Sequence, residues 1–537
     1  MIRRWLSRLP RLVASLPVTV GVVAFASSAF SQTITPRYGA VRDVPSDYFG
    51  INQNTVQFPG WADNPTFSPL VDRLNLRSVR YPGGTISQNF DWRTGRHVPG
   101  SEPRTDFSYT LDDLEFIRDT AGATPTYVLN MTASGGGLQN QLDLLRTARG
   151  RGLAVDRVEL GNEFYLGSGR GAFNGGDDYA RTANTWAAAI KSEFPGAKIA
   201  AVAAQNLPST DPNTRIGRWN DQMFPILSSE NIDAVTLHYY GGSTLGAPDS
   251  VTRAPNKWGT SQAQRAQYDA LTRPGGPDQF IGAAFDYVEN ITANTDVPDG
   301  FGVWVTENNL FDRAGPARHT WAHGMYTAAV QAQMLRDERV DQTHFHDLIN
   351  QASLFGLAFT GRGEEFDGLL VSELGITQTL DPEAGQLTAS GYAMEMFGLA
   401  LEDVDRAQRM FFENTPVVTD PTGDTHVGLL GFRMFDDDAD SRRILMINFS
   451  GDSLEIDTSS FIGQFDDVLT LSADPTRYVI DDDDVRRESF LLDPDGTTTL
   501  VPYSMTLFRE LTAVPEPSSF VVMGLIVATG AMRRRRR

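Results

Sequence analysis

The chain has 537 residues, of which 41% are hydrophobic, and a formal net charge of −21 from 46 basic and 67 acidic side chains. This composition supports a large buried core and excludes a wholly disordered chain. The acidic balance argues against a nucleic-acid binder, because binding through phosphate neutralisation needs a basic face. The sequence contains no cysteine, which excludes disulfides, thiolate nucleophiles and cysteine metal ligands.

Residues 1–31 have the three parts of an export signal. A basic start is followed by an apolar stretch from Leu16 to Ala26, and Ala29-Phe30-Ser31 forms a small-x-small cleavage site. The alternative is an N-terminal membrane anchor, but a helix needs roughly 20 apolar residues to span a bilayer. We therefore expect residues 1–31 to be a signal peptide.

Residues 514–537 form a second terminal signal. Val514-Pro515-Glu516-Pro517 precedes an apolar run from Phe520 to Met532, and five arginines end the chain. This order resembles the PEP-CTERM sorting signal of bacterial exported proteins. The resemblance implies processing by an exosortase-type enzyme and delivery to the cell surface or extracellular matrix, with membrane contact only through the terminal segments. An ordinary tail anchor is the alternative interpretation.

Residues 47–401 repeat a unit of an apolar strand followed by an amphipathic segment. This alternation is typical of a parallel sheet covered by helices. Eight units over this length predict an α/β fold of the TIM-barrel type, (β/α)8, although an open doubly wound sheet has a similar pattern. The expected strands are 49–52, 76–81, 125–130, 155–160, 198–204, 232–240, 302–306 and 342–348.

The pattern changes after residue 402. Short apolar runs, separated by turns rich in Asp, Gly, Ser and Pro, occur at 427–435, 443–449, 453–456 and 505–511, without helical periodicity. We therefore predict a C-terminal antiparallel β-sandwich over residues 402–513. Residues 32–46, which precede the first barrel strand, are expected to add a strand to it.

Two carboxylates follow strands of the predicted barrel. Glu163 ends the fourth strand segment, and Glu307 ends the seventh. The carboxyl ends of barrel strands form the active-site mouth, so both side chains are expected to face one cavity. Glycoside hydrolysis uses two carboxyl groups on either side of the scissile bond, about 5–5.5 Å apart in enzymes that retain anomeric configuration.

The pair Asn162-Glu163, together with Glu307, resembles the retaining glycoside hydrolases of clan A. The resemblance implies that Glu163 is the general acid/base, that Glu307 is the nucleophile and that Asn162 binds the sugar 2-hydroxyl group. It also implies that no metal and no organic cofactor is needed.

Three supporting residues extend the resemblance. His238 and Tyr240 lie two positions apart on the sixth strand, so they point the same way. Arg80 ends the second strand in the segment Arg80-Tyr81-Pro82-Gly83-Gly84. This segment is most similar to the heparanase/β-glucuronidase group, and the arabinofuranosidase group is close behind. The resemblance implies that Arg80 and Tyr240 contact the Glu307 carboxylate.

Other polar and aromatic residues are candidates for substrate binding or for structural roles. Glu159 is expected to form a structural salt bridge, and Trp304 is expected to belong to the core. The candidate substrate-binding residues are Trp92, Asn130, Tyr165, Asn308 and His346.

Taken together, these features predict an exported, surface-sorted retaining glycoside hydrolase that acts on a carbohydrate substrate. Two alternatives stay open. One is a non-catalytic carbohydrate-binding surface protein on a hydrolase scaffold, and the other is a structural matrix protein.

Overall fold

The computed structural model describes residues 34–53, 60–99, 108–205, 210–241, 261–294, 297–310, 315–350, 356–362, 366–436, 442–461, 465, 467–492 and 496–510. The predicted signal peptide, the predicted sorting segment and the loop at 242–260 lie outside these residues. Within the described ranges, no helix combines the length and the apolar character that a membrane span requires.

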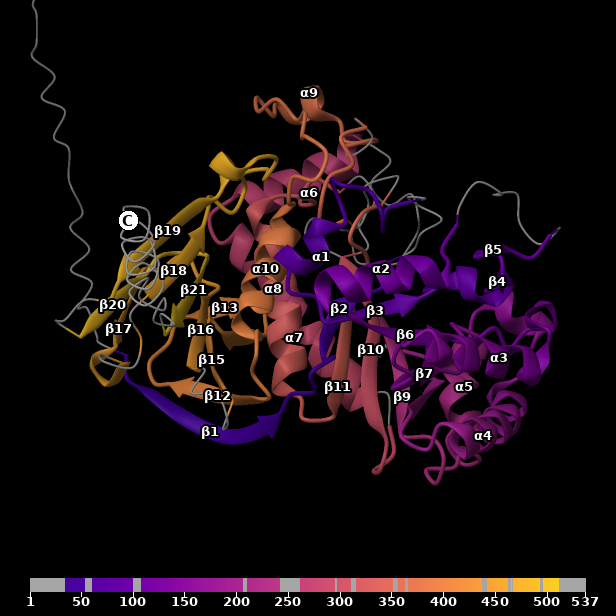
Figure 1. The fold of residues 1–537 in the computed structure, drawn as a ribbon. Coiled ribbons are helices and arrows are strands. Elements are labelled where there is room, and N and C mark those ends of the chain that lie inside the picture. The colour runs from indigo at the N-terminus through magenta and orange to yellow at the C-terminus, as the bar shows by residue number, and fades with distance from the viewer. Residues whose placement is uncertain are drawn as a thin grey trace, which may run out of the picture. The chain divides into compact units, whose positions relative to one another are not determined.

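Eight parallel strands close into a barrel, which confirms the predicted fold class (Figure 1). Their order around the barrel is β10-β11-β2-β3-β6-β7-β8-β9, so neighbours in sequence are neighbours in space. The strands are β2 (Phe49–Ile51), β3 (Ser78–Tyr81), β6 (Thr124–Val128), β7 (Arg157–Glu159), β8 (Lys198–Val202), β9 (Ala234–Gly241), β10 (Gly302–Leu310) and β11 (Val340–Phe345).

The barrel interior is a packed core below the mouth. Trp304 is fully buried there against Ala200 and Ala234, and the Arg157 guanidinium lies 4.8 Å from the Trp304 ring centre. The expected core position of Trp304 is therefore confirmed. Side chains such as Trp304 therefore fill the barrel interior, as in other barrels whose sites lie at the carboxyl ends of the strands.

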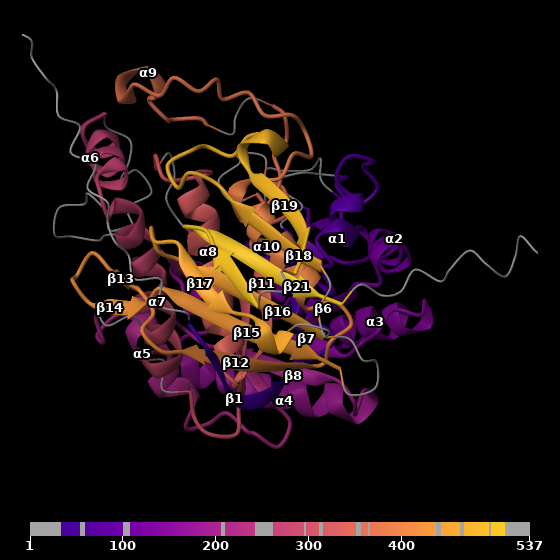
Figure 2. The same ribbon diagram turned by 90° about the vertical axis from the view of Figure 1, so that its left-hand side faces the viewer.

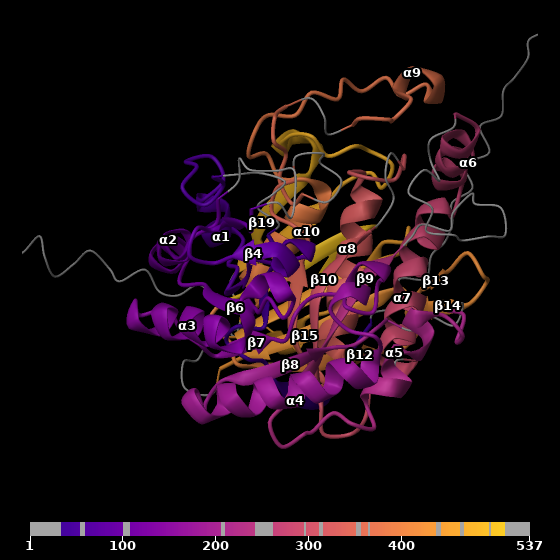
Figure 3. The same ribbon diagram turned by 90° about the vertical axis from the view of Figure 1, so that its right-hand side faces the viewer.

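Helices connect the strands and cover the outside of the barrel. Side-chain caps fix where several of them begin: Thr110 and Asp113 form a reciprocal capping box at α2, and Thr214 caps α5. Figure 3 shows α3, α4 and α5 on the barrel side. The helices are α1 (Pro69–Arg73), α2 (Leu111–Ala121), α3 (Gly137–Gly150), α4 (Gly176–Glu193), α5 (Arg215–Met223), α6 (Ser261–Thr272), α7 (Gly276–Asn294), α8 (Trp321–Arg336), α9 (Val371–Leu374) and α10 (Ala389–Ala400).

The C-terminal part builds a seven-stranded antiparallel sheet (Figure 2). Its first strand in the sheet order, β1, comes from before the barrel and pairs with β12. Three two-stranded antiparallel sheets contain the remaining strands: β4 (Phe90–Asp91) with β5 (Arg96–His97), β13 (Val417–Thr419) with β14 (Thr425–Val427), and β17 (Leu454–Asp457) with β20 (Thr497–Leu500). The large sheet runs β1 (Pro36–Asp43), β12 (Arg406–Phe412), β15 (Leu429–Phe435), β16 (Arg442–Asn448), β21 (Ser504–Arg509), β18 (Asp467–Ser472) and β19 (Arg486–Leu491).

Two helices lie between the barrel and the large sheet. Every residue of α8 from Trp321 to Leu335 is buried, as expected of a helix with protein on all sides. Helix α8 contacts β10 and β11, and α10 contacts α8, β16 and β21. The opposite face of the sheet is covered by β17 and β20, through a core that contains Ile444, Ile456 and Phe508. The layer that completes the sandwich is therefore a two-stranded antiparallel sheet.

Candidate active site

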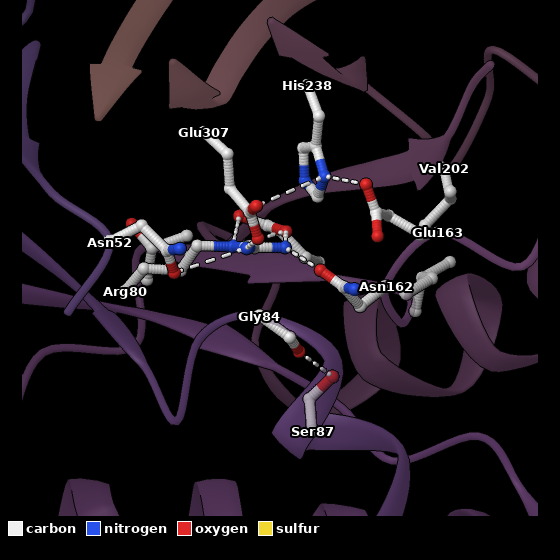
Figure 4. Close-up of polar contacts among 12 residues, drawn as sticks. Asn52, Arg80, Gly84, Ser87, Asn162, Glu163, Val202, His238 and Glu307 are labelled. Carbon is white, nitrogen blue, oxygen red and sulfur yellow. Dashed lines mark hydrogen bonds and ion pairs between the residues drawn. The ribbon is translucent and has the colours of Figure 1, made fainter. Parts of the chain in front are cut away.

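The carboxyl ends of four barrel strands bring charged side chains together (Figure 4). Arg80 comes from β3, His238 from β9 and Glu307 from β10, while Glu163 follows β7. All four were predicted from the sequence to meet at the mouth, and the structure brings them into direct contact with one another.

A β-bulge in β10 determines where Glu307 points. The pairing of β10 with β9 shifts between Val305 and Glu307, so that Glu307 lies opposite the inward-facing His238. Regular alternation from the inward-facing Trp304 would turn Thr306 inward and Glu307 outward. The extra residue at the bulge brings Glu307 to the inside, as bulges beside active sites commonly do.

A tight turn after β7 presents Glu163. Gly161 has φ +95°, and a β-carbon there would lie 2.0 Å from the Phe164 ring. Glu163 itself has φ +46°, a left-handed conformation that costs roughly 1–2 kcal/mol for a residue other than glycine. Such strain is typical of positions whose side-chain direction matters for function.

Arg80 is the centre of the hydrogen-bond network and is fully buried. Its Nε donates to both Glu159 carboxylate oxygens at 3.0 Å, and Nη2 donates to Glu159 Oε2 at 2.7 Å. Nη1 donates to Glu307 Oε1 at 2.5 Å and to Asn52 Oδ1 at 3.2 Å, and Nη2 also donates to Asn162 Oδ1 at 2.9 Å. The five N–H groups of the guanidinium are therefore all used.

Glu307 is held as an anion. The Tyr240 hydroxyl donates to Glu307 Oε2 at 2.6 Å, and the Arg80 ion pair occupies Oε1. Burial alone would raise the pKa of Glu307, but attraction to His238, Arg80 and His346 and the Tyr240 hydrogen bond outweigh it and lower the pKa to about 2. Burial, together with Glu307, raises the pKa of Tyr240 well above its ordinary value, so the phenol stays a donor.

Glu163 has a different environment. Its Oε1 lies 2.9 Å from His238 Nδ1 and accepts a hydrogen bond from the Tyr165 hydroxyl at 3.1 Å. Its side chain is 17% exposed, against 6% for Glu307. Both of these contacts involve Oε1, which leaves Oε2 as the oxygen suited to exchange a proton with a bound molecule.

The two carboxylates are close enough to act on one bond. One oxygen of Glu163, one oxygen of Glu307 and a ring nitrogen of His238 all lie within 4.8 Å of one another. This separation is in the range of retaining rather than inverting glycosidases, whose carboxyl groups are roughly 6.5–9.5 Å apart. The same three atoms could also hold a metal ion, but the Arg80 charge beside Glu307 opposes a cation there.

Metal removal tests these two interpretations of the carboxylate pair. If the two carboxylates serve glycoside hydrolysis, dialysis against EDTA is expected to leave hydrolysis of an aryl glycoside unchanged within about twofold, because both carboxylates would then act directly on the sugar. A loss of activity that Zn²⁺ or Mn²⁺ restores would instead assign Glu163, His238 and Glu307 to a metal.

Three further residues that the sequence predicted for the site, Asn162, Tyr165 and His346, lie beside this hydrogen-bond network. Asn162 is fully buried, and its Nδ2 has no partner among the described residues, so one amide donor is available at the mouth. Tyr165 contacts Glu163 through its hydroxyl group. The His346 ring packs edge-on against Tyr240, with 6.0 Å between ring centres. Burial lowers the pKa of His346, although Glu307 partly opposes this effect.

Sequence reasoning missed Asn52 and Gln88. Asn52 follows β2, and its Nδ2 lies 2.6 Å from His346 Nδ1 while its Oδ1 accepts from Arg80. Gln88 Nε2 donates to the Asn162 carbonyl at 2.5 Å. The sequence could have indicated Asn52 as a site residue, because it is a polar residue directly after the first apolar strand, at the carboxyl end of that strand. Gly83, with φ +73°, makes room for it, because a β-carbon at Gly83 would lie 2.3 Å from Asn52 Oδ1.

The structure corrects the expected role of Asn308. Its Nδ2 donates to Thr343 Oγ1 at 3.1 Å and to the His344 carbonyl at 2.7 Å, and its Oδ1 accepts from Gln331 on α8 at 2.9 Å. The bulge that turns Glu307 inward turns Asn308 outward to the helical layer. Asn308 therefore joins β10 to its neighbours and does not face the mouth.

Asn130 and Trp92 have structural contacts. Asn130 Nδ2 donates to the Phe90 carbonyl, and its Oδ1 accepts from Thr132, so its amide braces the loop after β6. Trp92 Nε1 donates to the Asn140 carbonyl at 3.1 Å, and the Arg93 guanidinium lies 4.6 Å from the Trp92 ring centre. For both residues a contact with substrate stays a prediction.

Solved structures resemble this chain over most of its length. A family 51 α-L-arabinofuranosidase from Bifidobacterium longum has 16% identity and a TM-score of 0.65, over 89% of this chain and 99% of that one. An α-L-arabinofuranosidase from Thermotoga maritima has 17% identity and a TM-score of 0.57, over the same shares of the two chains. The chain has the fold of the family 51 glycoside hydrolases.

The family 51 fold is also similar to an enzyme of another specificity. A 4-O-α-L-rhamnosyl-β-D-glucuronidase from Fusarium oxysporum has 14% identity and a TM-score of 0.52, over 89% of this chain and 100% of that one. No protein-family model and no curated protein matches the sequence. At these identities the likeness shows the fold alone.

Proposed function

We propose that this protein is an exported retaining glycoside hydrolase, with Glu307 as the nucleophile and Glu163 as the general acid/base. The observation that carries the proposal is the pair of carboxylates within 4.8 Å at the barrel mouth, in two different environments. Glu307 is held ionised by Arg80 and Tyr240, whereas Glu163 is more exposed and makes its hydrogen bonds to described residues through Oε1 alone. This asymmetry is what double displacement requires.

The mechanism assigns a step to each group. Glu307 attacks the anomeric carbon while Glu163 protonates the departing oxygen, which leaves a glycosyl ester on Glu307. Glu163 then takes a proton from water, which attacks the same carbon and releases Glu307. The free Nδ2 donor of Asn162 is suited to the sugar 2-hydroxyl group, a contact that strengthens as positive charge develops on the ring.

The proposed substrates are α-L-arabinofuranosides or β-D-glucuronides. The named solved structures include enzymes of both types, and the sequence segment around Arg80 resembles the glucuronidase group. Export and surface sorting are proposed from the terminal segments alone, and an exosortase-type enzyme is the proposed processing partner.

A panel of 4-nitrophenyl glycosides tests the proposal. The mature protein should hydrolyse the α-L-arabinofuranoside or the β-D-glucuronide in preference to the β-xyloside and β-glucoside. Proton NMR of the first-formed sugar should show the anomeric configuration of the substrate. An inverted product would contradict the assigned roles, and no hydrolysis accompanied by retention on a glycan column would favour the non-catalytic binding protein.

Removing the Tyr240 hydroxyl should slow the reaction, because Glu307 loses a donor that holds its carboxylate in place and that stabilises its charge when this charge returns in the second step. Tyr240→Phe is expected to lower kcat by about 10- to 100-fold, the usual effect of losing one donor to a charged reacting group. The pKa of Glu307 should rise, so the acidic limb of the pH–rate profile should move to higher pH. Tyr239→Phe is the matched control, because alternation places Tyr239 on the opposite face of β9. Equal effects of the two substitutions would contradict a specific role for Tyr240.

A further inference from the structure

Glu159 is a second buried carboxylate beside the proposed site. It ends β7, four residues before Glu163, and its side chain is fully buried. Both carboxylate oxygens of Glu159 accept hydrogen bonds from Arg80, from Nε at 3.0 Å and, at Oε2, also from Nη2 at 2.7 Å. Tyr165 and His238 contact Glu163, the other acidic residue of this segment.

One guanidinium therefore links two carboxylates. Nε and Nη2 of Arg80 face Glu159, while Nη1 faces Glu307 at 2.5 Å. The exposed fractions of the three side chains are 0%, 0% and 6%. Bulk water and salt screen buried charges far less than surface charges, so a change at Glu159 reaches Glu307 through Arg80.

Without the negative charge of Glu159, the positive charge of Arg80 would be less neutralised. Its electrostatic attraction for the Glu307 carboxylate would then be stronger. A stronger cation beside Glu307 would stabilise the anion, which would make it a weaker nucleophile. The same cation would make Glu307 a better leaving group. Glu159 is thus placed to set the balance between these two demands.

We propose that Glu159 is a positioning residue that orients Arg80 and neutralises part of its charge, so that Glu307 stays nucleophilic. The inference rests on the proposed function and deepens it. In the first step the bond from Glu307 to the anomeric carbon forms and the bond to the leaving oxygen breaks, so Glu307 loses its charge. In the second step water bonds to that carbon, its proton goes to Glu163, and the bond from the carbon to Glu307 breaks, so that Glu307 regains its charge.

The two steps therefore respond in opposite directions to the loss of the Glu159 charge. With the 2,4-dinitrophenyl glycoside of the sugar that the wild type accepts, single-turnover kinetics gives the first rate constant and steady-state kinetics gives the second. For Glu159→Gln the rate constant of the first step, formation of the glycosyl ester, is expected to fall about tenfold. The rate constant of the second step, hydrolysis of this ester, is expected to rise about threefold. The pre-steady-state burst of dinitrophenol should shrink or vanish.

Two further variants separate this role from a structural one. Glu159→Asp keeps the charge but withdraws it from Arg80, so it should shift both rate constants in the same directions by a smaller factor. Asp47→Asn is the matched control, because Asp47 pairs with Arg157 at the other end of β7. It removes a carboxylate from a buried arginine of the same strand, and it should leave the ratio of the two rate constants unchanged.

Each outcome decides the proposal. Opposite shifts in Glu159→Gln or Glu159→Asp, without such shifts in Asp47→Asn, would support it. If both steps slow together, or if neither Glu159 variant accumulates as folded protein by thermal melting, Glu159 serves the stability of the barrel and the inference is wrong. If the wild type hydrolyses no glycoside, the proposed function fails first, and that result is distinguishable because it involves no variant.

Discussion

Glu307→Ala is expected to be almost inactive on every glycoside, with a loss of kcat on the order of 10⁵-fold. The substitution removes the atom that bonds to the anomeric carbon, so no change of leaving group can compensate. Arg80 keeps its contacts with Glu159, Asn52 and Asn162, and the variant should therefore still fold.

Addition of azide tests the role of Glu307 through the configuration of the product that Glu307→Ala forms. The vacated space lies on the face from which Glu307 attacks, so azide should enter there and yield a glycosyl azide of inverted configuration. Glu338→Ala is the control, since Glu338 is an exposed carboxylate beyond the end of α8 and its loss should leave kcat unchanged. A Glu307→Ala variant with near wild-type activity would show that the reaction takes place elsewhere.

Glu163→Ala is expected to behave differently with different leaving groups. A sugar leaving group needs the proton from Glu163, so hydrolysis of an oligosaccharide should fall by roughly 10²- to 10⁴-fold. A dinitrophenolate leaves without a proton, so the glycosyl ester on Glu307 should still form. It should then persist, because the base that activates water is missing.

Azide should restore turnover of Glu163→Ala, because this anion attacks without a base. The product should be a glycosyl azide of retained configuration, the opposite of the Glu307→Ala product. A pattern with the two products exchanged would mean that the roles of the carboxylates are exchanged. Rescue of neither variant would contradict double displacement at this site.

The barrel could be predicted because its signal is local and repeated. Strands buried on both faces are apolar runs, and each predicted run overlaps one of the eight barrel strands. Glu163 and Glu307 follow two of these runs, and parallel strands bring their carboxyl ends to one mouth. The position of the carboxylate pair therefore followed from strand order, without knowledge of side-chain packing.

The errors came from geometry that a periodic pattern does not contain. The bulge in β10 adds one residue to the alternation, which reverses the directions of Glu307 and Asn308 relative to a regular strand. Asn52 joins the network through Arg80, a contact between residues 28 positions apart in sequence that depends on the turn at Gly83. The second layer of the C-terminal sandwich is a two-stranded sheet of β17 and β20, which are not consecutive in the chain, and short polar strands such as β20 have a weak signal.

The most direct test of the central claim is the site of covalent attachment in Glu163→Ala. The variant would be incubated with the 2,4-dinitrophenyl glycoside that the wild type accepts, quenched in acid and digested for mass spectrometry. The peptide that contains Glu307 should gain the mass of one glycosyl residue, and fragmentation should place it on that side chain. A glycosyl residue on another carboxylate, or no attachment while dinitrophenol is released in a burst, would contradict Glu307 as the nucleophile.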